Sequence, residues 1–452
     1  MATRESQFLW SESTQHYPSH LRLGDIAPRS SLCYTRKYTK EYLSSLRLQG
    51  DPLADDVSSC LHEHHGGLVK IHDLLGRVRE KAEQGGPHTE AFRRFCQDIA
   101  VTPDWARPEL IDRGQRLHAV LNPLMGLSLF AGSLVGGGQF VTAATVTALA
   151  GNITSDPTRR INETALLLAA LAFPGSLLKA GGQAHDSLLR VRLLHGALRH
   201  WLPRSGRLDR HPELVPARVY VPGEVPINQQ DLAITLGIFC YTNLRSLKRM
   251  GVLLGWQDVE AYVHMWRYAG HVLGILPELC PKTFEEQREF MLASMLHQGV
   301  PSSMQEQQTK DFVRAFSENF SRRVPFGLIS EDTFQEFFLQ MIVYLNGSDH
   351  VAGVNITDHG ESHWSVRLVK ALGFTFGTVM PQYVPFGFSL LFTLHTYNIR
   401  RALEKRGTPT GHGAGSGQVP GAQKQTGGKA TAGKAKEGIG APVSTRQAKS
   451  RL

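Results

Sequence analysis

The sequence has few cysteines and no pairing pattern among them: five occur at wide, irregular spacing, without a Cys-x-x-Cys pair. An odd number of isolated cysteines favours a reducing compartment over a disulfide framework. Residues 1–17 carry charges but lack the apolar core of a secretory signal, so we do not expect the protein to be secreted.

Regular alternation of apolar and polar residues, the pattern of a half-buried strand, is also missing. Apolar residues instead recur at helical intervals, and no repeat of solenoid type is present. The sequence therefore predicts an all-α fold class, with a single large helical domain at 51–405. We expect residues 1–50 to form an N-terminal arm and residues 406–452, which are poor in apolar side chains, to form a disordered tail. Asn228 is expected to cap a helix that has Asp231 in its first turn.

Positive charge is concentrated in that tail. The chain has a formal net charge of +9, and much of the excess lies after residue 400, where Lys and Arg meet few acids. Nucleic-acid binding requires a basic folded surface, which the sequence does not indicate, so we expect no nucleic-acid partner. The tail ends in Ser450, Arg451 and Leu452, which resemble a peroxisomal address of the Ser-Lys-Leu type. We therefore expect recognition by a peroxisomal import receptor, with a cytoplasmic or membrane-associated location as the alternative.

Two long stretches, residues 117–155 and 371–399, contain no Lys, Arg, Asp or Glu. Each exceeds the ~20 residues with which a helix spans a bilayer. Prolines and glycines interrupt both, among them Pro123 and Pro381, so a smooth transmembrane helix is not favoured. We interpret both stretches as buried or interfacial helices and expect peripheral rather than spanning contact with a membrane.

The most informative helix is expected at residues 189–199. Arg192, His195 and Arg199 stand at i, i+3 and i+7, so one helical face would carry an imidazole flanked by two guanidinium groups. This arrangement suits haem, because the imidazole can ligate iron while the arginines bind carboxylates. The alternative is a histidine that is hydrogen-bonded within an ordinary amphipathic helix.

Five short stretches resemble a known family in the same order along the chain: 133–137 (SLVGG), 160–164 (RINET), 191–199 (VRLLHGALR), 226–231 (PINQQD) and 266–270 (WRYAG). The family contains bacterial latex-clearing rubber oxygenases and the fungal endoplasmic-reticulum-bound oxygenase of mycophenolic acid biosynthesis. Each stretch is weak alone, and the order of all five makes the resemblance specific. It implies that haem b is the cofactor and that the helices pack in a globin-like manner around a haem pocket.

The resemblance also implies roles for single residues. His195 would be the proximal ligand of the iron, and therefore the metal ligand, with Arg192 and Arg199 beside the cofactor. Arg160 and Thr164 would lie on its other side. Their i, i+4 spacing places a guanidinium and a hydroxyl on one helical face, where they could hold a propionate or orient bound dioxygen.

The sequence departs from the rubber-cleaving members at two positions. They have a lysine immediately before the threonine, where this chain has Glu163. They also have a catalytic glutamate about one helix earlier, in a stretch that corresponds here to residues 142–147, which hold no carboxylate. Glu163 is therefore the candidate proton-handling group, grouped with Arg160 and Thr164 in the catalytic set. The alternative is an ion pair between Glu163 and Arg160 that fixes the helix.

The activity that the resemblance implies is that of a haem-dependent oxygenase. Its partners would be dioxygen and a small lipophilic substrate, such as an isoprenoid, whose alkene is oxidised or cleaved. Two other functions stay open at this point: a non-catalytic haem-binding or lipid-binding protein, and a helical scaffold without a cofactor.

Overall fold

The computed structural model describes residues 23–65, 71–137, 140, 146, 157–206, 223–299, 303–322, 329–351 and 360–406. Within these ranges the chain forms helices, and the one β contact is an isolated bridge between Phe140 and Gly299, so the expected all-α class is confirmed. The expected tail, apart from Arg406, lies outside the described residues, and so does its C-terminal tripeptide. The helices are α2 (Lys40–Leu46), α3 (Pro52–His64), α4 (Ile71–Gln84), α5 (Glu90–Ala100), α6 (Pro108–Val120), α7 (Asn122–Leu127), α8 (Val135–Gly137), α10 (Pro157–Leu171), α11 (Gln183–Trp201), α13 (Gln229–Gly237), α14 (Asn243–Arg249), α15 (Trp256–Val272), α16 (Phe284–Gln298), α17 (Ser303–Ser321), α18 (Glu331–Asn346), α19 (Trp364–Phe374), α20 (Met380–Tyr383) and α21 (Gly387–Arg406).

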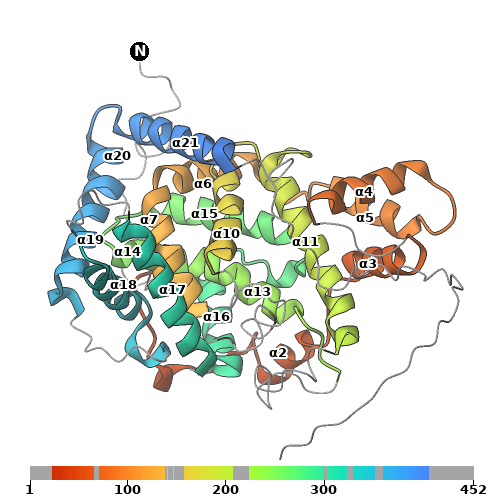
Figure 1. The fold of residues 1–452 in the computed structure, drawn as a ribbon, viewed down its shortest axis with the longest axis horizontal. Helices are drawn as coiled ribbons and strands as arrows, with labels where there is room; N and C mark the ends of the chain where they lie inside the picture. The colour runs from red at the N-terminus through yellow and green to blue at the C-terminus, as the bar shows by residue number, and fades with distance from the viewer. Residues whose placement is uncertain are drawn as a thin grey trace, which may run out of the picture.

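Helix α15 lies at the centre of the core (Figure 1), because twelve of its seventeen residues are buried. It packs against α6 at Gly114, where a Cβ would stand 2.7 Å from the carbonyl oxygen of Ala261. The missing side chain lets the two backbones approach closely. Tyr262 and Trp266 are fully buried on the same helix and fill the core with aromatic area.

Three segments adopt π-helical geometry within longer helical stretches: η3 (Ser128–Leu134), η6 (Ile238–Thr242) and η11 (Thr375–Val379). Segments η3 and η6 pack against each other. Such segments are rare and often occur beside functional sites, because the wider turn redirects side chains. The contact between η3 and η6 is therefore one place to look for a site.

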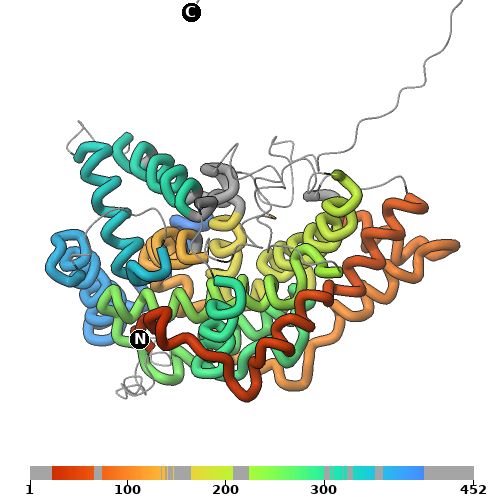
Figure 2. The backbone as a smooth tube through the Cα atoms, turned by 90° about the horizontal axis from the view of Figure 1, so that it is seen from below, coloured from red at the N-terminus to blue at the C-terminus, as the bar shows by residue number. Residues whose placement is uncertain are grey.

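The part of the expected N-terminal arm that the structure describes is built into the core. Tyr38, Leu43 and Leu46 are buried, and α2 packs on α13 and α16. Helices α3, α4 and α5 form a lobe beyond α11, at the right in Figures 1 and 2. Asn228 caps α13 as expected, since its side chain accepts a hydrogen bond from the backbone N–H of Asp231 at 3.0 Å.

No single described helix is long and apolar enough to cross a membrane. Helix α6 and residues Asn122–Gly137 meet the length and composition test as a pair, bent by 81° between them.

Candidate functional site

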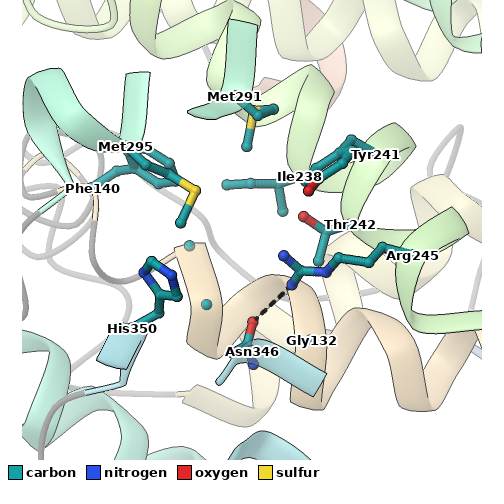
Figure 3. Close-up of a pocket in the computed structure, with 12 residues that line it drawn as sticks. Gly132, Phe140, Ile238, Tyr241, Thr242, Arg245, Met291, Met295, Asn346 and His350 are labelled. Carbon is teal, nitrogen blue, oxygen red and sulfur yellow. Dashed lines mark hydrogen bonds between the residues drawn. The ribbon is translucent and has the colours of Figure 1, made fainter. Parts of the chain in front are cut away.

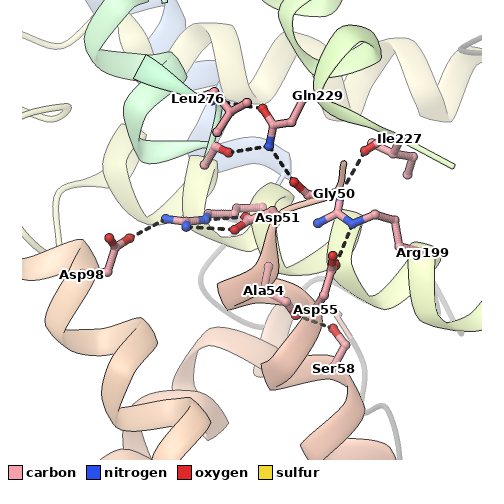
Figure 4. A network of polar contacts seen from close by, with 12 residues as sticks. Gly50, Asp51, Ala54, Asp55, Ser58, Asp98, Arg199, Ile227, Gln229 and Leu276 are labelled. Carbon is pink, nitrogen blue, oxygen red and sulfur yellow. Dashed lines mark hydrogen bonds and ion pairs between the residues drawn. The ribbon is translucent and has the colours of Figure 1, made fainter. Parts of the chain in front are cut away.

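Arg192 and Arg199 both lie on α11 and bind carboxylates in the first turn of α3 (Figure 4). The guanidinium of Arg192 donates to both oxygens of Asp51, at 2.7 and 3.1 Å, and its Nη1 donates to Asp98 at 3.0 Å. The Nε of Arg199 donates to Asp55 at 2.6 Å. Two successive turns of α11 are thereby joined to one turn of α3 by charge-assisted hydrogen bonds.

The same network includes the stretch at 226–231 (Figure 4). The side-chain amide of Gln229 donates to the carbonyls of Gly50 and Gly274, at 2.8 and 3.1 Å, and its oxygen accepts from the backbone N–H of Leu276 at 3.0 Å. The start of α3, the start of α13 and the end of α15 are therefore fixed to one another. In the structure this stretch holds helices together.

The two arginines are buried, and each forms an ion pair with carboxylates of the protein itself. Burial lowers the pKa of Arg192, but the hydrogen bond and charge of Asp51, with the charge of Asp98, outweigh it and leave this pKa above its usual value. Burial raises the pKa of Asp55, and Arg199 only partly opposes this. In the structure both guanidiniums bind protein carboxylates, and their expected role beside a cofactor stays a prediction.

His195 lies near the middle of α11 and its side chain is half-buried. The next residue, Gly196, marks the contact with α3: a Cβ there would stand 2.6 Å from the carbonyl oxygen of Ala54. Successive helical residues turn by about 100°, so His195 points to the side of this contact while the arginines point into it. The expected common face holds for Arg192 and Arg199, and His195 lies at its edge.

Arg160, Glu163 and Thr164, the residues expected on the other side of the cofactor, lie on α10. This helix confirms the i, i+4 relation of Arg160 and Thr164, and the side chain of Thr164 is half-buried. The side chains of Arg160 and Glu163 lie outside the described part of the structure, so their ion pair stays a prediction. Within 142–147 only Val146 is described, and it is buried.

A second polar site, which we did not predict from the sequence, is a small cavity between η3, η6 and α16 (Figure 3). Arg245 is 5% exposed and points toward it, with Nη2 donating to the carbonyl of Leu345 at 3.0 Å. The Nε of Arg245 and the hydroxyl of Tyr241 are buried and have no hydrogen-bond partner among the described residues. Buried polar atoms are normally hydrogen-bonded, so the cavity suits water or the polar end of a small molecule.

Gly136 and Gly137, from the first of the five stretches, line this cavity. A Cβ at Gly136 would meet the side chain of Asn346, and one at Gly137 would meet Ile238. A sequence signal that could have indicated the cavity is Arg245, the single charge in the apolar run 232–247.

Residues 118–373 match a family model described as ER-bound oxygenase mpaB/B'/Rubber oxygenase, catalytic domain. The match covers more than half of the chain. The chain belongs to this family. Helices α10 and α11 and all of the residues that line the cavity lie inside the matched region. Asp51, Asp55 and Asp98, which bind the two buried arginines, precede it.

One relative is the rubber oxygenase of Streptomyces sp. (strain K30), which is 26% identical over 244 residues. The alignment covers 52% of this chain and 55% of the relative, so the chain spans about half the length of that protein. The fold also resembles a solved structure of latex clearing protein in the closed state, with a TM-score of 0.53 at 20% sequence identity. That likeness covers 79% of this chain and 90% of the other, and it supports the fold.

Proposed function

We propose that this protein is a haem-dependent oxygenase that oxidises or cleaves an alkene in an isoprenoid or another lipophilic molecule, with dioxygen as co-substrate. The observation that carries the proposal is the match of residues 118–373 to an oxygenase catalytic domain, a region that contains His195 and α10. The similarity to a relative named rubber oxygenase supports a lipophilic substrate.

Among the side chains of α11, the imidazole of His195 fits haem as a ligand of its iron. His195 offers a half-buried imidazole, a common axial ligand of haem iron. The described residues hold no group of three or more His, Cys, Asp or Glu placed to bind a metal ion. An iron at His195 would therefore take its other ligands from a cofactor. Arg192 does not fit as a donor to a haem carboxylate in this arrangement, because Asp51 and Asp98 already bind it. Arg199, which Asp55 binds at Nε, keeps a buried Nη2 that has no hydrogen-bond partner among the described residues.

Haem, when bound, supplies the activation of dioxygen. His195 would hold the iron at Nε2 or Nδ1 and fix its distance from α11. The hydroxyl of Thr164 on α10 can donate a hydrogen bond to an anionic oxygen, and buried leucines on both helices exclude water. Glu163 would hold or transfer a proton at its carboxylate, or it would pair with Arg160 and fix the helix.

The two roles of Glu163 predict different results for Glu163→Gln. This substitution keeps the shape and hydrogen bonding of the side chain but removes proton transfer. A loss of turnover of more than about 10²-fold, with haem retained, would indicate general acid or base catalysis. Turnover close to that of the unmodified protein would leave Glu163 with the structural role.

The main test is the visible spectrum of the purified protein, followed by oxygen consumption with a prenyl alkene. We expect a Soret band at one haem per chain. His195→Ala should abolish it, whereas His200→Ala, the same substitution five residues later on α11, should retain it, because His200 lies beside Ser59 on α3.

Other outcomes separate the remaining functions. A Soret band without oxygen consumption or products would indicate a non-catalytic haem protein. A protein that takes up no haem would be a lipid-binding protein or a helical scaffold. Full haem binding with an unchanged spectrum in His195→Ala would remove His195 as the ligand.

A further inference from the structure

Helices α19 to α21 lie along the left and upper edge of the molecule in Figure 1. They expose a row of large apolar side chains to solvent. Of the seventeen large apolar side chains that are exposed among the described residues, eleven lie within 364–397. On α19, Trp364, Leu368 and Leu372 recur every fourth residue and so form one stripe. Val369, on the other side, is buried. The stripe is therefore the side of α19 that faces away from the core.

Helix α21 repeats the pattern. Phe386, just before it, Leu390 and Leu394 recur every fourth residue and are 64, 58 and 49% exposed. The opposite side packs on α6, where the Nδ1 of His395 donates to the carbonyl of Val120 at 2.9 Å. The exposed apolar side chains therefore belong to a folded helix, because α21 is anchored to the core on its inner side.

The backbone is strained at the corner between α20 and α21, where two aromatic side chains are exposed. Phe386 has a φ of +61°, which bulky side chains rarely adopt. Gly387 makes the turn possible, since a Cβ there would stand 1.9 Å from the carbonyl oxygen of Met380. Tyr383, at the same corner, is 68% exposed. Strain that surrounding packing maintains often marks a functional site, and here it places Phe386 in solvent.

The charged residues within this surface are basic, and the acids Glu361 and Glu336 at its edge pair with Lys370 and His363. No Asp or Glu occurs between residues 362 and 403, and Arg367, Arg400 and Arg401 are exposed at its ends. Residues 400–452 hold eleven Lys and Arg against two acids, an excess of nine that equals the net charge of the whole chain. The basic excess therefore begins at the end of α21 and continues directly after it in the sequence, and Arg367, Arg400 and Arg401 are described basic residues beside the exposed apolar side chains.

We propose that the apolar surface of α19 to α21 docks on the anionic leaflet of a lipid bilayer. Apolar and aromatic side chains would enter the interfacial region, and the basic residues would bind lipid phosphates and carboxylates. A second copy of the chain fits less well, because self-association would bring two positive segments together. The surface lies mostly beyond residue 373, where the match to the oxygenase family ends, and it does not depend on the proposed oxygenase activity.

Co-sedimentation of the full chain with vesicles tests this. We expect binding to phosphatidylcholine vesicles that contain roughly a quarter phosphatidylserine, at least about 10-fold stronger than to phosphatidylcholine alone. Leu390→Ser/Leu394→Ser should weaken binding to both vesicles by about 10-fold or more. Arg400→Gln/Arg401→Gln should weaken only binding to the anionic vesicles.

The matched control is Leu48→Ser/Val101→Ser, which removes two apolar side chains of similar exposure outside the surface. It should bind vesicles as the unmodified chain does, and all variants should melt cooperatively. No binding of the unmodified chain to either vesicle would overturn the proposal, as would equal loss in the control. Sedimentation velocity gives a third result that would refute the proposal. In that result the unmodified chain forms concentration-dependent dimers but does not bind vesicles, and Leu390→Ser/Leu394→Ser abolishes the dimers.

Discussion

Replacing Arg192 by methionine should destabilise the protein strongly, because it would leave the carboxylate of Asp51 buried without its partner. Arg192 and Asp51 are 4 and 3% exposed, and two hydrogen bonds of 2.7 and 3.1 Å join them. Removing one partner of a buried ion pair costs about 3–5 kcal/mol, most of it the desolvated charge that remains. Methionine keeps the packing of the apolar stem and removes the guanidinium, including its cation–π contact with Phe95, so the measured loss reports mainly on the charge.

This free energy corresponds to a measurable shift in melting temperature. With about 330 residues in the described structure, an unfolding entropy of ~2.1 cal/mol/K per residue gives ~0.7 kcal/mol/K. The Arg192→Met protein should therefore melt about 4–7 °C lower, as measured by far-ultraviolet circular dichroism without added haem. Asp51→Asn in the same chain should recover much of the loss, because the buried charge is then gone.

The control is Arg94→Met, which removes the ion pair of Arg94 with Asp56 between α5 and α3. Both partners are about half exposed, so the pair is worth about 0–1 kcal/mol and the melting point should fall by less than about 2 °C. Equal shifts for Arg192→Met and Arg94→Met would refute the reasoning. A stable Arg192→Met protein that fails to retain haem would instead assign Arg192 to the cofactor.

Three further outcomes are expected. Gly196→Ala should destabilise by about 1–3 kcal/mol because its Cβ meets the backbone of α3, whereas Gly76→Ala, which meets open space, should stabilise by up to about 1 kcal/mol in the same melts. Burial lowers the pKa of His118 to about 4, below its unfolded value of about 6.5. The stability that the neutral imidazole contributes to the folded state is therefore fully present above pH ~6.5 and is lost toward pH 4 at about 1.4 kcal/mol per pH unit. Melts of His118→Gln should show a shallower loss over that range. Deleting residues 450–452 from an N-terminally fluorescent fusion should disperse it from peroxisomes, and an unchanged distribution would refute that address.

Local features of the fold could be predicted because their signals are local. Asn228 and Asp231 lie within one turn, so the cap of α13 follows from side chains that are neighbours in the sequence. The common face of Arg192 and Arg199 likewise follows from helical periodicity. What these arginines bind does not follow, because Asp51 and Asp55 lie more than 140 residues earlier. A single sequence does not state which helices pack together. Carboxylates of haem and carboxylates of another helix are equally compatible with two arginines on one helical face.

The apolar stretch 371–399 shows a similar division. Its lack of charge predicted a buried or interfacial position, and its prolines and glycines predicted broken helices, which the structure shows as α19, α20 and α21. Which side chains face outward depends on the packing of α21 against α6 and of Gly373 against the carbonyl of Met250. These long-range contacts leave the helices anchored on one side and apolar on the exposed side, and contact with a membrane stays a prediction.

Helix α21, which carries part of the proposed docking surface, packs on α10, and this contact has a consequence for lipophilic substrates. Ala119 of α6, Ala172 after α10 and Ile399 of α21 form a small apolar cluster of their own. Helix α10, which carries Thr164, therefore lies against the inner side of the helix that would contact lipid. A substrate dissolved in the bilayer would then reach α10 without crossing water. If both proposals hold, Leu390→Ser/Leu394→Ser should lower turnover of a prenyl substrate held in anionic vesicles by about 10-fold, in line with weaker docking, and leave turnover of the same substrate in detergent micelles unchanged. An equal loss in both would show that these leucines support the fold or the active site, and no loss in either would separate substrate delivery from the surface.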